Sequence, residues 1–144
     1  MVERFFQTVV SPGTVSAASA WAREVADELR LSSQDAYRVD LVVTEIVQNL
    51  FDHADPASRE VPLTVHLRAD GQELRLSVID EGPAFDPLAV PLPAQPEDIG
   101  AASLGGLGIH LVREFSEQCS YARRGESNCL EAVFVLERPG AKAA

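Results

Sequence analysis

Two runs of alternating apolar and polar residues on either side of one Asp-Gly dipeptide constrain the fold more than any other feature. In residues 61–68 every second residue is apolar, and residues 74–78 repeat the pattern after Asp70-Gly71. A period of two is typical of strands with one buried face, and Asp-Gly is a strong hairpin turn. The middle of the chain is therefore predicted to form an antiparallel hairpin whose inner face another layer must cover.

Two segments with helical periodicity precede this hairpin and can supply that layer. The first is residues 15–30, where Trp21, Val25 and Leu29 recur every fourth position. The second runs from Ser32 to about Ala54, and its opening Ser-Ser-Gln-Asp resembles a capping box with Asp in the Glu position. Its apolar residues have the spacing of a core-facing stripe: Val39, Val42, Val43, Ile46, Val47 and Leu50.

The remaining predicted elements fix the fold class. Strands are expected over residues 5–10, 119–124 and 129–136, and a helix from Ile109 to about Glu117. Strands and helices do not alternate strictly, which favours the α+β class. We expect a two-layer α/β sandwich, with a mostly antiparallel sheet and helices on one face. The 144 residues are predicted to form a single domain, 1–144, that ends in a tail over 138–144.

Charge and composition exclude several classes of function. A net charge of −10 leaves no basic face for direct binding of nucleic acid, and no apolar run approaches the ~18 residues of a membrane span. The first four residues do not resemble a secretory leader, so a cytoplasmic location is expected. The one lysine, Lys142, lies in the tail, which removes P-loop, ordinary protein-kinase and Schiff-base mechanisms. Cys119 and Cys129 are expected to be reduced thiols, although they could instead face each other across a hairpin.

Three polar residues on the second helix are candidates for chemistry. Glu45, Asn49 and His53 are four residues apart, so they share one side of the helix and border its apolar stripe. A carboxylate at this rim is partly desolvated, which favours a raised pKa and a general-base role. The side-chain oxygen of Asn49 suits a hard cation such as Mg²⁺. An ordinary amphipathic helix with a polar edge would give the same pattern.

Asp80 and a glycine-rich segment are two further candidates. Counting by two from Leu74 places Asp80 on the inward face of its strand, where a carboxylate needs hydrogen-bond donors. An Asp followed by Glu-Gly-Pro can equally be a turn former. The glycines of residues 105–108 are expected to open the third helix, where free N–H groups suit phosphate, although glycine also caps and breaks helices. Residues 83–103 hold five prolines and no periodicity, which indicates a functional lid or a disordered loop.

In this order and spacing, the three segments resemble the N, G1 and G2 boxes of the GHKL ATPase superfamily. The matching residues are Glu45-x-x-x-Asn49-x-x-x-His53, then Asp80-Glu81-Gly82-Pro83-Ala84-Phe85, then Gly105-Gly106-Leu107-Gly108-Ile109. Within the superfamily, the short chain is similar to the bacterial anti-sigma-factor serine/threonine kinases. The resemblance extends from the first strand to about Leu136, and it implies a Bergerat-type ATP-binding fold, that of a histidine-kinase-like ATPase domain.

The resemblance also implies a role for each matching position. Asp80 would accept a hydrogen bond from the adenine amino group, Asn49 would hold Mg²⁺ at the phosphates of ATP, and Glu45 would deprotonate the attacking hydroxyl. Gly82 would allow the close approach of adenine, and residues 83–103 would form an ATP lid. Backbone amides of Gly105, Gly106 and Gly108 would reach the phosphates. The other positions expected at the nucleotide are His53, Ala84, Phe85, Leu107 and Ile109, with Ala84 standing where the superfamily usually has a second glycine.

The function implied by the resemblance is an ATP-dependent kinase that phosphorylates Ser or Thr on an anti-sigma-factor antagonist of the STAS type. Such a protein would also sequester a sigma factor and form a homodimer. The alternative is a nucleotide-gated binding module that transfers no phosphate. Glu45 favours the kinase, since a pure binding module needs no base, whereas Ala84 favours the binding module. A sensor histidine kinase core is less expected, because no histidine precedes His53.

Overall fold

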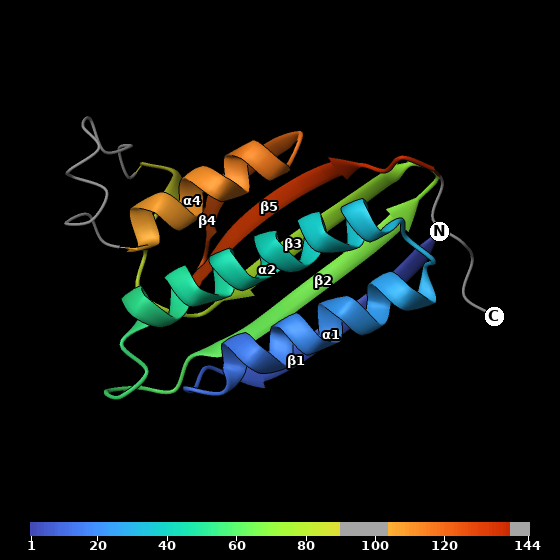
Figure 1. Cartoon of the computed structure of the whole chain (residues 1–144). Helices are drawn as coiled ribbons and strands as arrows, with labels where there is room; N and C mark the ends of the chain where they lie inside the picture. Colours follow the sequence, from blue (N-terminus) through green and yellow to red (C-terminus); the bar gives the residue numbers. More distant parts are fainter. Residues whose placement is uncertain (90–103, 139–144) are drawn as a thin grey trace.

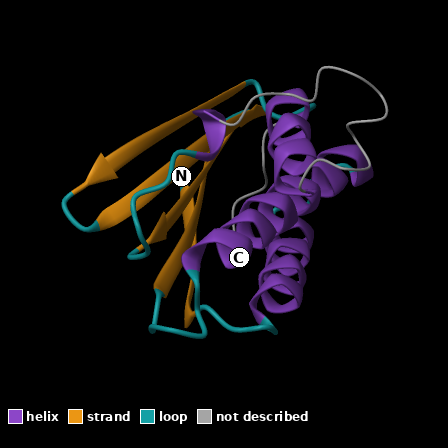
Figure 2. Ribbon diagram, turned by 90° about the vertical axis from the view of Figure 1, so that its left-hand side faces the viewer, coloured by secondary structure: helices purple, strands orange, loops and turns teal. Residues whose placement is uncertain are grey.

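Five antiparallel strands form one sheet, and three helices cover one of its faces, in the parts of the chain that the computed structural model describes, residues 1–89 and 104–138 (Figures 1 and 2). The strand order is β1-β2-β3-β5-β4. The elements in chain order are β1 (Val2–Val9), α1 (Thr14–Glu28), α2 (Ser33–Ala54), β2 (Pro62–Asp70), β3 (Glu73–Asp80), the 3₁₀ turn η1 (Pro87–Ala89), α4 (Leu104–Phe115), β4 (Gln118–Arg124) and β5 (Ser127–Val135). This arrangement confirms the predicted α+β sandwich.

Helix α2 lies between α1 and α4 and contributes the largest share of the helical side of the core (Figure 1). Every residue of its predicted apolar stripe is buried. Ser32 caps the helix by accepting a hydrogen bond from the backbone N–H of Asp35 at 3.1 Å. The reciprocal half of the expected capping box is not made, because the Asp35 carboxylate pairs instead with Arg38 at 3.0 Å and accepts the N–H of Glu137 at 2.8 Å.

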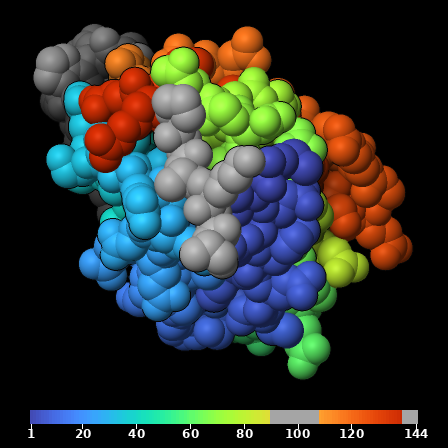
Figure 3. All heavy atoms as spheres, turned by 90° about the vertical axis from the view of Figure 1, so that its right-hand side faces the viewer, coloured from blue at the N-terminus to red at the C-terminus, as the bar shows by residue number. Residues whose placement is uncertain are grey.

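The predicted hairpin is present as β2 and β3, with Gly71 at a φ of 62° in its turn. The pairing places Asp80 opposite Leu63 of β2 on one side and opposite Asn128 of β5 on the other. Strand β1 begins at Val2, three residues before the predicted start, because it pairs with β2 along its whole length. It forms one edge of the sheet, and its residues, dark blue in Figure 3, lie at the surface of that view.

Helix α4 differs from the sequence prediction at its start. It begins at Leu104, whereas the sequence predicted a helix from Ile109 with the glycines ahead of it. Ile109 and Val112 are buried in the core, so packing against the sheet and α2 outweighs the poor helix propensity of glycine. The glycines therefore belong to the first turns of the helix.

Cys119 and Cys129 are free thiols, as expected. Cys119 lies opposite Ala132 and Cys129 opposite Ala122, so the two cysteines are offset along the β4–β5 hairpin and point to opposite faces. The idea that they face each other is wrong. Within residues 1–89 and 104–138, no helix has the length and apolar character needed to cross a bilayer.

Candidate functional site

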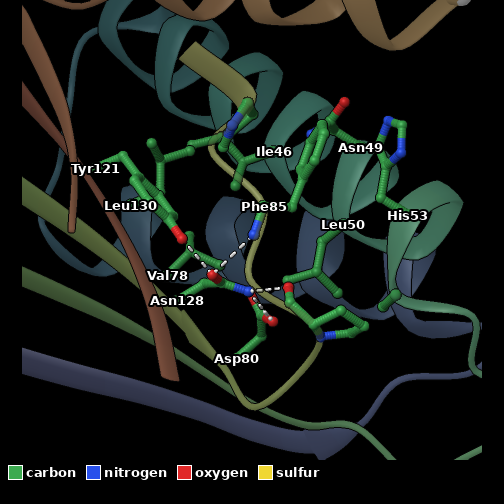
Figure 4. Close-up of a pocket in the computed structure, with 13 residues that line it drawn as sticks. Ile46, Asn49, Leu50, His53, Val78, Asp80, Phe85, Tyr121, Asn128 and Leu130 are labelled. Carbon is green, nitrogen blue, oxygen red and sulfur yellow. Dashed lines mark hydrogen bonds between the residues drawn. The ribbon is translucent and has the colours of Figure 1, made fainter. Parts of the chain in front are cut away.

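A pocket opens between the C-terminal half of α2 and the end of β3. Together with the open solvent at its mouth, it contains about 430 Å³ of empty space. Its walls are mainly apolar, with a few polar groups that converge on the space (Figure 4). The lining residues are Ile46, Asn49, Leu50, His53, Ala54, Val78, Asp80, Pro83, Phe85, Pro87, Tyr121, Asn128 and Leu130.

Asp80 lies on the inward face of β3 and is 8% exposed, which confirms the position that the alternation predicted. One carboxylate oxygen, Oδ1, accepts hydrogen bonds from the N–H of Gly82 at 2.9 Å and from Nδ2 of Asn128 at 3.0 Å. Both of these bonds go to Oδ1, and Oδ2 has no hydrogen-bond partner among the described residues. Asp80 thus shapes the following turn and also presents one acceptor atom to an apolar pocket.

Gly82 is required by the position of Asp80. A β-carbon at residue 82 would lie 2.9 Å from Oδ1 of Asp80 and 3.6 Å from side-chain atoms of Ala54 and Val61. Gly82 is buried and lies at a neighbouring polar cleft, while Ala84 is exposed and lines neither cavity. The structure therefore explains why position 82 must be small and places no comparable restriction on position 84.

Asn49 is 4% exposed, and its Oδ1 is a buried acceptor without a hydrogen-bond partner in the described part of the chain. An unpaired buried acceptor costs free energy, so a ligand that pairs with it would be stabilised. Its oxygen suits Mg²⁺, which usually takes one or two protein oxygens together with phosphates and water. In the described ranges no group of three or more His, Cys, Asp or Glu could hold a metal by itself. A metal here would accordingly need oxygens from a ligand.

His53 and Phe85 form one side of the pocket. Their rings stack with centroids 4.1 Å apart, and in Figure 4 both lie beside Asn49. Phe85 lies in the segment after β3, just before the 3₁₀ turn η1. A hydrogen bond from Arg113 of α4 to the carbonyl of Leu88 connects η1 to α4. The beginning of the expected 83–103 lid contributes Pro83, Phe85 and Pro87 to this wall. Residues 90–103 lie outside the described residues.

Glu45 lies one turn before Asn49 but does not line the pocket. It is half-buried, with its carboxylate against Gly108 of α4. Burial raises the pKa of Glu45 above its ordinary value, as expected for a carboxylate at the rim of the stripe. Glu45 therefore lies beside the pocket rather than in its wall, and its carboxyl holds a proton more tightly than an exposed glutamate does.

Of the predicted residues of the third segment, Gly108 and Ile109 can be compared with the pocket, and neither lines it. Ile109 is 2% exposed and belongs to the hydrophobic core. Gly105, Gly106 and Leu107 lie in the first turns of α4, and their surroundings are outside the described residues. The structure thus brings Asn49, His53, Asp80 and Phe85 together in the pocket and places Ile109 in the core.

Asn128 and Tyr121 are pocket residues that the sequence analysis missed. The amide of Asn128 donates to Asp80 and to the carbonyl of Pro83, and it accepts from the N–H of Phe85 and the hydroxyl of Tyr121 (Figure 4). The sequence could have indicated Asn128, because it is an even number of residues from the buried Leu130 and Phe134 and so points to the same inward face of β5. A polar residue in such a series indicates a buried hydrogen-bond network.

Comparison with known proteins decides the family. Residues 9–134 match the family model described as a histidine kinase-like ATPase domain. The chain belongs to this family. Among its relatives is the serine/threonine-protein kinase BtrW of Bordetella bronchiseptica (strain RB50), which is 29% identical over 121 residues, covering 84% of this chain and 85% of the relative.

Solved structures agree with this histidine kinase-like ATPase fold. The RsbU and RsbW domains of Rv1364c from Mycobacterium tuberculosis give a TM-score of 0.70 at 14% identity, over 100% of this chain and 35% of that one. This chain thus spans about a third of that longer protein. The SiaB–SiaC complex from Pseudomonas aeruginosa gives a TM-score of 0.60 at 16% identity, over 91% of this chain and 89% of the other. At such low identity these two likenesses concern the fold alone.

Membership of the histidine kinase-like ATPase family gives the pocket an expected ligand, ATP. The apolar walls suit a flat heterocycle, and the free carboxylate oxygen of Asp80 suits an N–H donor on its edge. Asn49 lies in the pocket with Asp80, and Glu45 lies one turn further toward the start of α2, where it contacts Gly108 of α4. One side of α2 therefore connects the pocket with the half-buried carboxylate of Glu45.

Proposed function

We propose that this chain is an ATP-dependent serine/threonine kinase that phosphorylates a hydroxyl group on a partner protein. The observation that carries the proposal is that one pocket holds two acceptor atoms without a hydrogen-bond partner in the described residues, Oδ2 of Asp80 and Oδ1 of Asn49. The half-buried carboxylate of Glu45, whose pKa is raised, lies one helical turn before Asn49 on α2. The kinase name of the 29% identical relative supports the same activity.

Each residue of the proposed site has one task. The free oxygen of Asp80 accepts a hydrogen bond from the exocyclic amino group of adenine. Asn49 Oδ1 would be a ligand of Mg²⁺, and the metal would supply charge neutralisation at the phosphates. Glu45 accepts the proton of the substrate hydroxyl while the oxygen of that hydroxyl bonds to the γ-phosphorus. The bond from the γ-phosphorus to the bridging oxygen breaks in the same transfer, so ADP leaves and a phosphoester remains.

The proposed partners follow from the family resemblance and from the relatives. We infer that the substrate is an anti-sigma-factor antagonist of the STAS type and that the chain also sequesters a sigma factor as a homodimer. The RsbW domain and the SiaB–SiaC complex among the similar folds support a partner protein as the substrate. Because ATP is the phosphate donor, the reaction is expected in the cytoplasm.

A nucleotide-gated binding module is the second candidate, and one observation favours it. Glu45 packs against α4 outside the pocket lining, which is also compatible with a structural carboxylate that senses the position of α4. In that case nucleotide would change the affinity for a partner without transfer of phosphate.

The two candidates are separated by calorimetry and by phosphate transfer on the same preparation. We expect ATP to bind, and to bind more tightly with Mg²⁺ than with EDTA, while GTP binds more weakly because its base presents a carbonyl where adenine has an amino group. Labelled ATP should then transfer phosphate to a serine-bearing antagonist domain. No binding at millimolar ATP would refute both candidates, and binding without transfer to any antagonist would favour the binding module.

A further inference from the structure

Gly108 is the residue at which α4 meets Glu45 of α2. A β-carbon at position 108 would overlap Oε2 of Glu45, and it would lie 3.4 Å from Cδ and 3.7 Å from Cβ of the same side chain. All of the atoms within 4 Å that are nearest to this position belong to Glu45. The Glu45 side chain therefore lies along the surface that the missing side chain of Gly108 leaves open.

The backbone of Gly108 gives no reason for a glycine. The glycines with positive φ in the described part of the chain are Gly71 and Gly125, and Gly108 lies within the regular part of α4. Inside a helix glycine is less favourable than alanine, because it loses more backbone entropy on folding. No positive φ calls for glycine at position 108, and the space that a β-carbon would occupy there is filled by Glu45.

The amide of Gly108 is not a free donor in this form of the helix. Gly108 is the fifth residue of α4, so its N–H falls within the i to i−4 hydrogen-bond pattern, beyond the unpaired donors of the first turn. The phosphate-binding role that the family resemblance implies for its backbone stays a prediction. The contact between Gly108 and Glu45 is a separate feature of this residue.

We propose that Gly108 is a positioning residue for Glu45. Because Gly108 has no side chain, it leaves space between α2 and α4, and the carboxylate of the general base Glu45 lies in that space. This inference rests on the proposed kinase function. A methyl group at position 108 would displace the carboxylate, which is the free end of a flexible side chain, while the helical backbone would accept alanine without strain. The predicted defect is a misplaced base in a stably folded protein.

The first test compares Gly108→Ala with Gly13→Ala. Around Gly13 a β-carbon would meet nothing within 4 Å, and its φ is −86°, so this variant controls for the gain of a methyl group. We expect Gly108→Ala to bind Mg²⁺-ATP as the wild type does and to transfer phosphate ~10²-fold more slowly, the scale of a misplacement of about 1 Å. Gly13→Ala should match the wild type in both. Wild-type transfer by Gly108→Ala would overturn the proposal.

A double variant tests whether the effect passes through Glu45. If it does, Glu45→Gln/Gly108→Ala transfers phosphate no more slowly than Glu45→Gln alone, because the base that Gly108 positions is already absent. The contrary result is a double variant whose loss of transfer rate is the product of the losses in the two single variants, together with weaker nucleotide binding by Gly108→Ala. That result would assign Gly108 to the phosphates and overturn the proposal.

The melting temperature gives a readout that does not depend on activity. Gly108→Ala should raise the melting temperature more in a Glu45→Ala background than in the wild type, because only the wild type has a carboxylate to displace. Equal shifts in the two backgrounds would refute the contact itself. A wild-type protein that shows this coupling but binds no nucleotide would instead refute the proposed function, and with it the role of the contact in catalysis.

Discussion

Asp80 is the residue on which recognition of the base should depend most. Asp80→Asn keeps the size of the side chain but replaces a charged acceptor with an amide. We expect ATP binding to weaken by ~2–3 kcal/mol, the value of a charge-assisted hydrogen bond in a buried site. Glu81→Gln, at the exposed neighbouring position, is the matched control and should bind as the wild type does. Calorimetry measures both, and unchanged affinity in Asp80→Asn would reduce Asp80 to a turn residue.

Glu45 should make the stability of the protein depend on pH in a definite direction. Burial raises the pKa of its carboxyl in the folded state, so the folded chain holds this proton more tightly than the unfolded chain. The resulting stabilisation is full below the unfolded pKa and is lost as the pH rises through the folded pKa. Glu45→Gln has no such proton, so its melting temperature relative to the wild type should rise between pH 4 and pH 8. A difference that does not vary with pH would contradict this account of Glu45.

The hydrogen bonds of Asn128 connect three elements: the end of β3, the segment after it, and β4. All four bonding positions of its amide are used. Asn128→Ala should lower the free energy of unfolding by ~1–3 kcal/mol, since it leaves buried partners unpaired, and it should weaken ATP binding through Asp80. Tyr121→Phe removes one of the four bonds and should cost ~0.5–1.5 kcal/mol. Urea unfolding measures both variants and should show the larger loss of unfolding free energy for Asn128→Ala. An equal loss for both variants would contradict the network.

Among the elements, those with strong periodicity could be predicted from the sequence and those that depend on partners could not. The stripe of α2 and the alternation of β2 and β3 set the buried faces, so Asp80 could be placed inward before the fold was known. The start of α4 was missed, because packing of Ile109 and Val112 holds glycines in a helix that their propensity disfavours. Asn128 was missed because its contact with Asp80 depends on the pairing of β3 with β5, which no local pattern specifies.

At the scale of the whole molecule, Asp35 joins the start of α2 to the end of the sheet. Its carboxylate is 1% exposed and pairs with Arg38 and with the N–H of Glu137. Asp35→Asn should lower the free energy of unfolding by ~3 kcal/mol, because Arg38 loses its buried partner. Glu28→Gln breaks the exposed pair with Arg4 and should cost less than ~1 kcal/mol. Urea midpoints compare the two, and similar costs would show that the Asp35 pair contributes no more than a surface ion pair.

The proposed function requires that one side of α2 lead from an adenine-binding pocket to a proton acceptor. The most direct test is the rate of phosphate transfer from labelled ATP to a serine-bearing antagonist, measured for the wild type and for Glu45→Gln at saturating nucleotide. Glutamine keeps the shape of the side chain and removes its ability to accept the proton. We predict unchanged ATP affinity and a ~10²–10⁴-fold slower transfer. Equal transfer rates for the two proteins would contradict the assignment of Glu45 as the base.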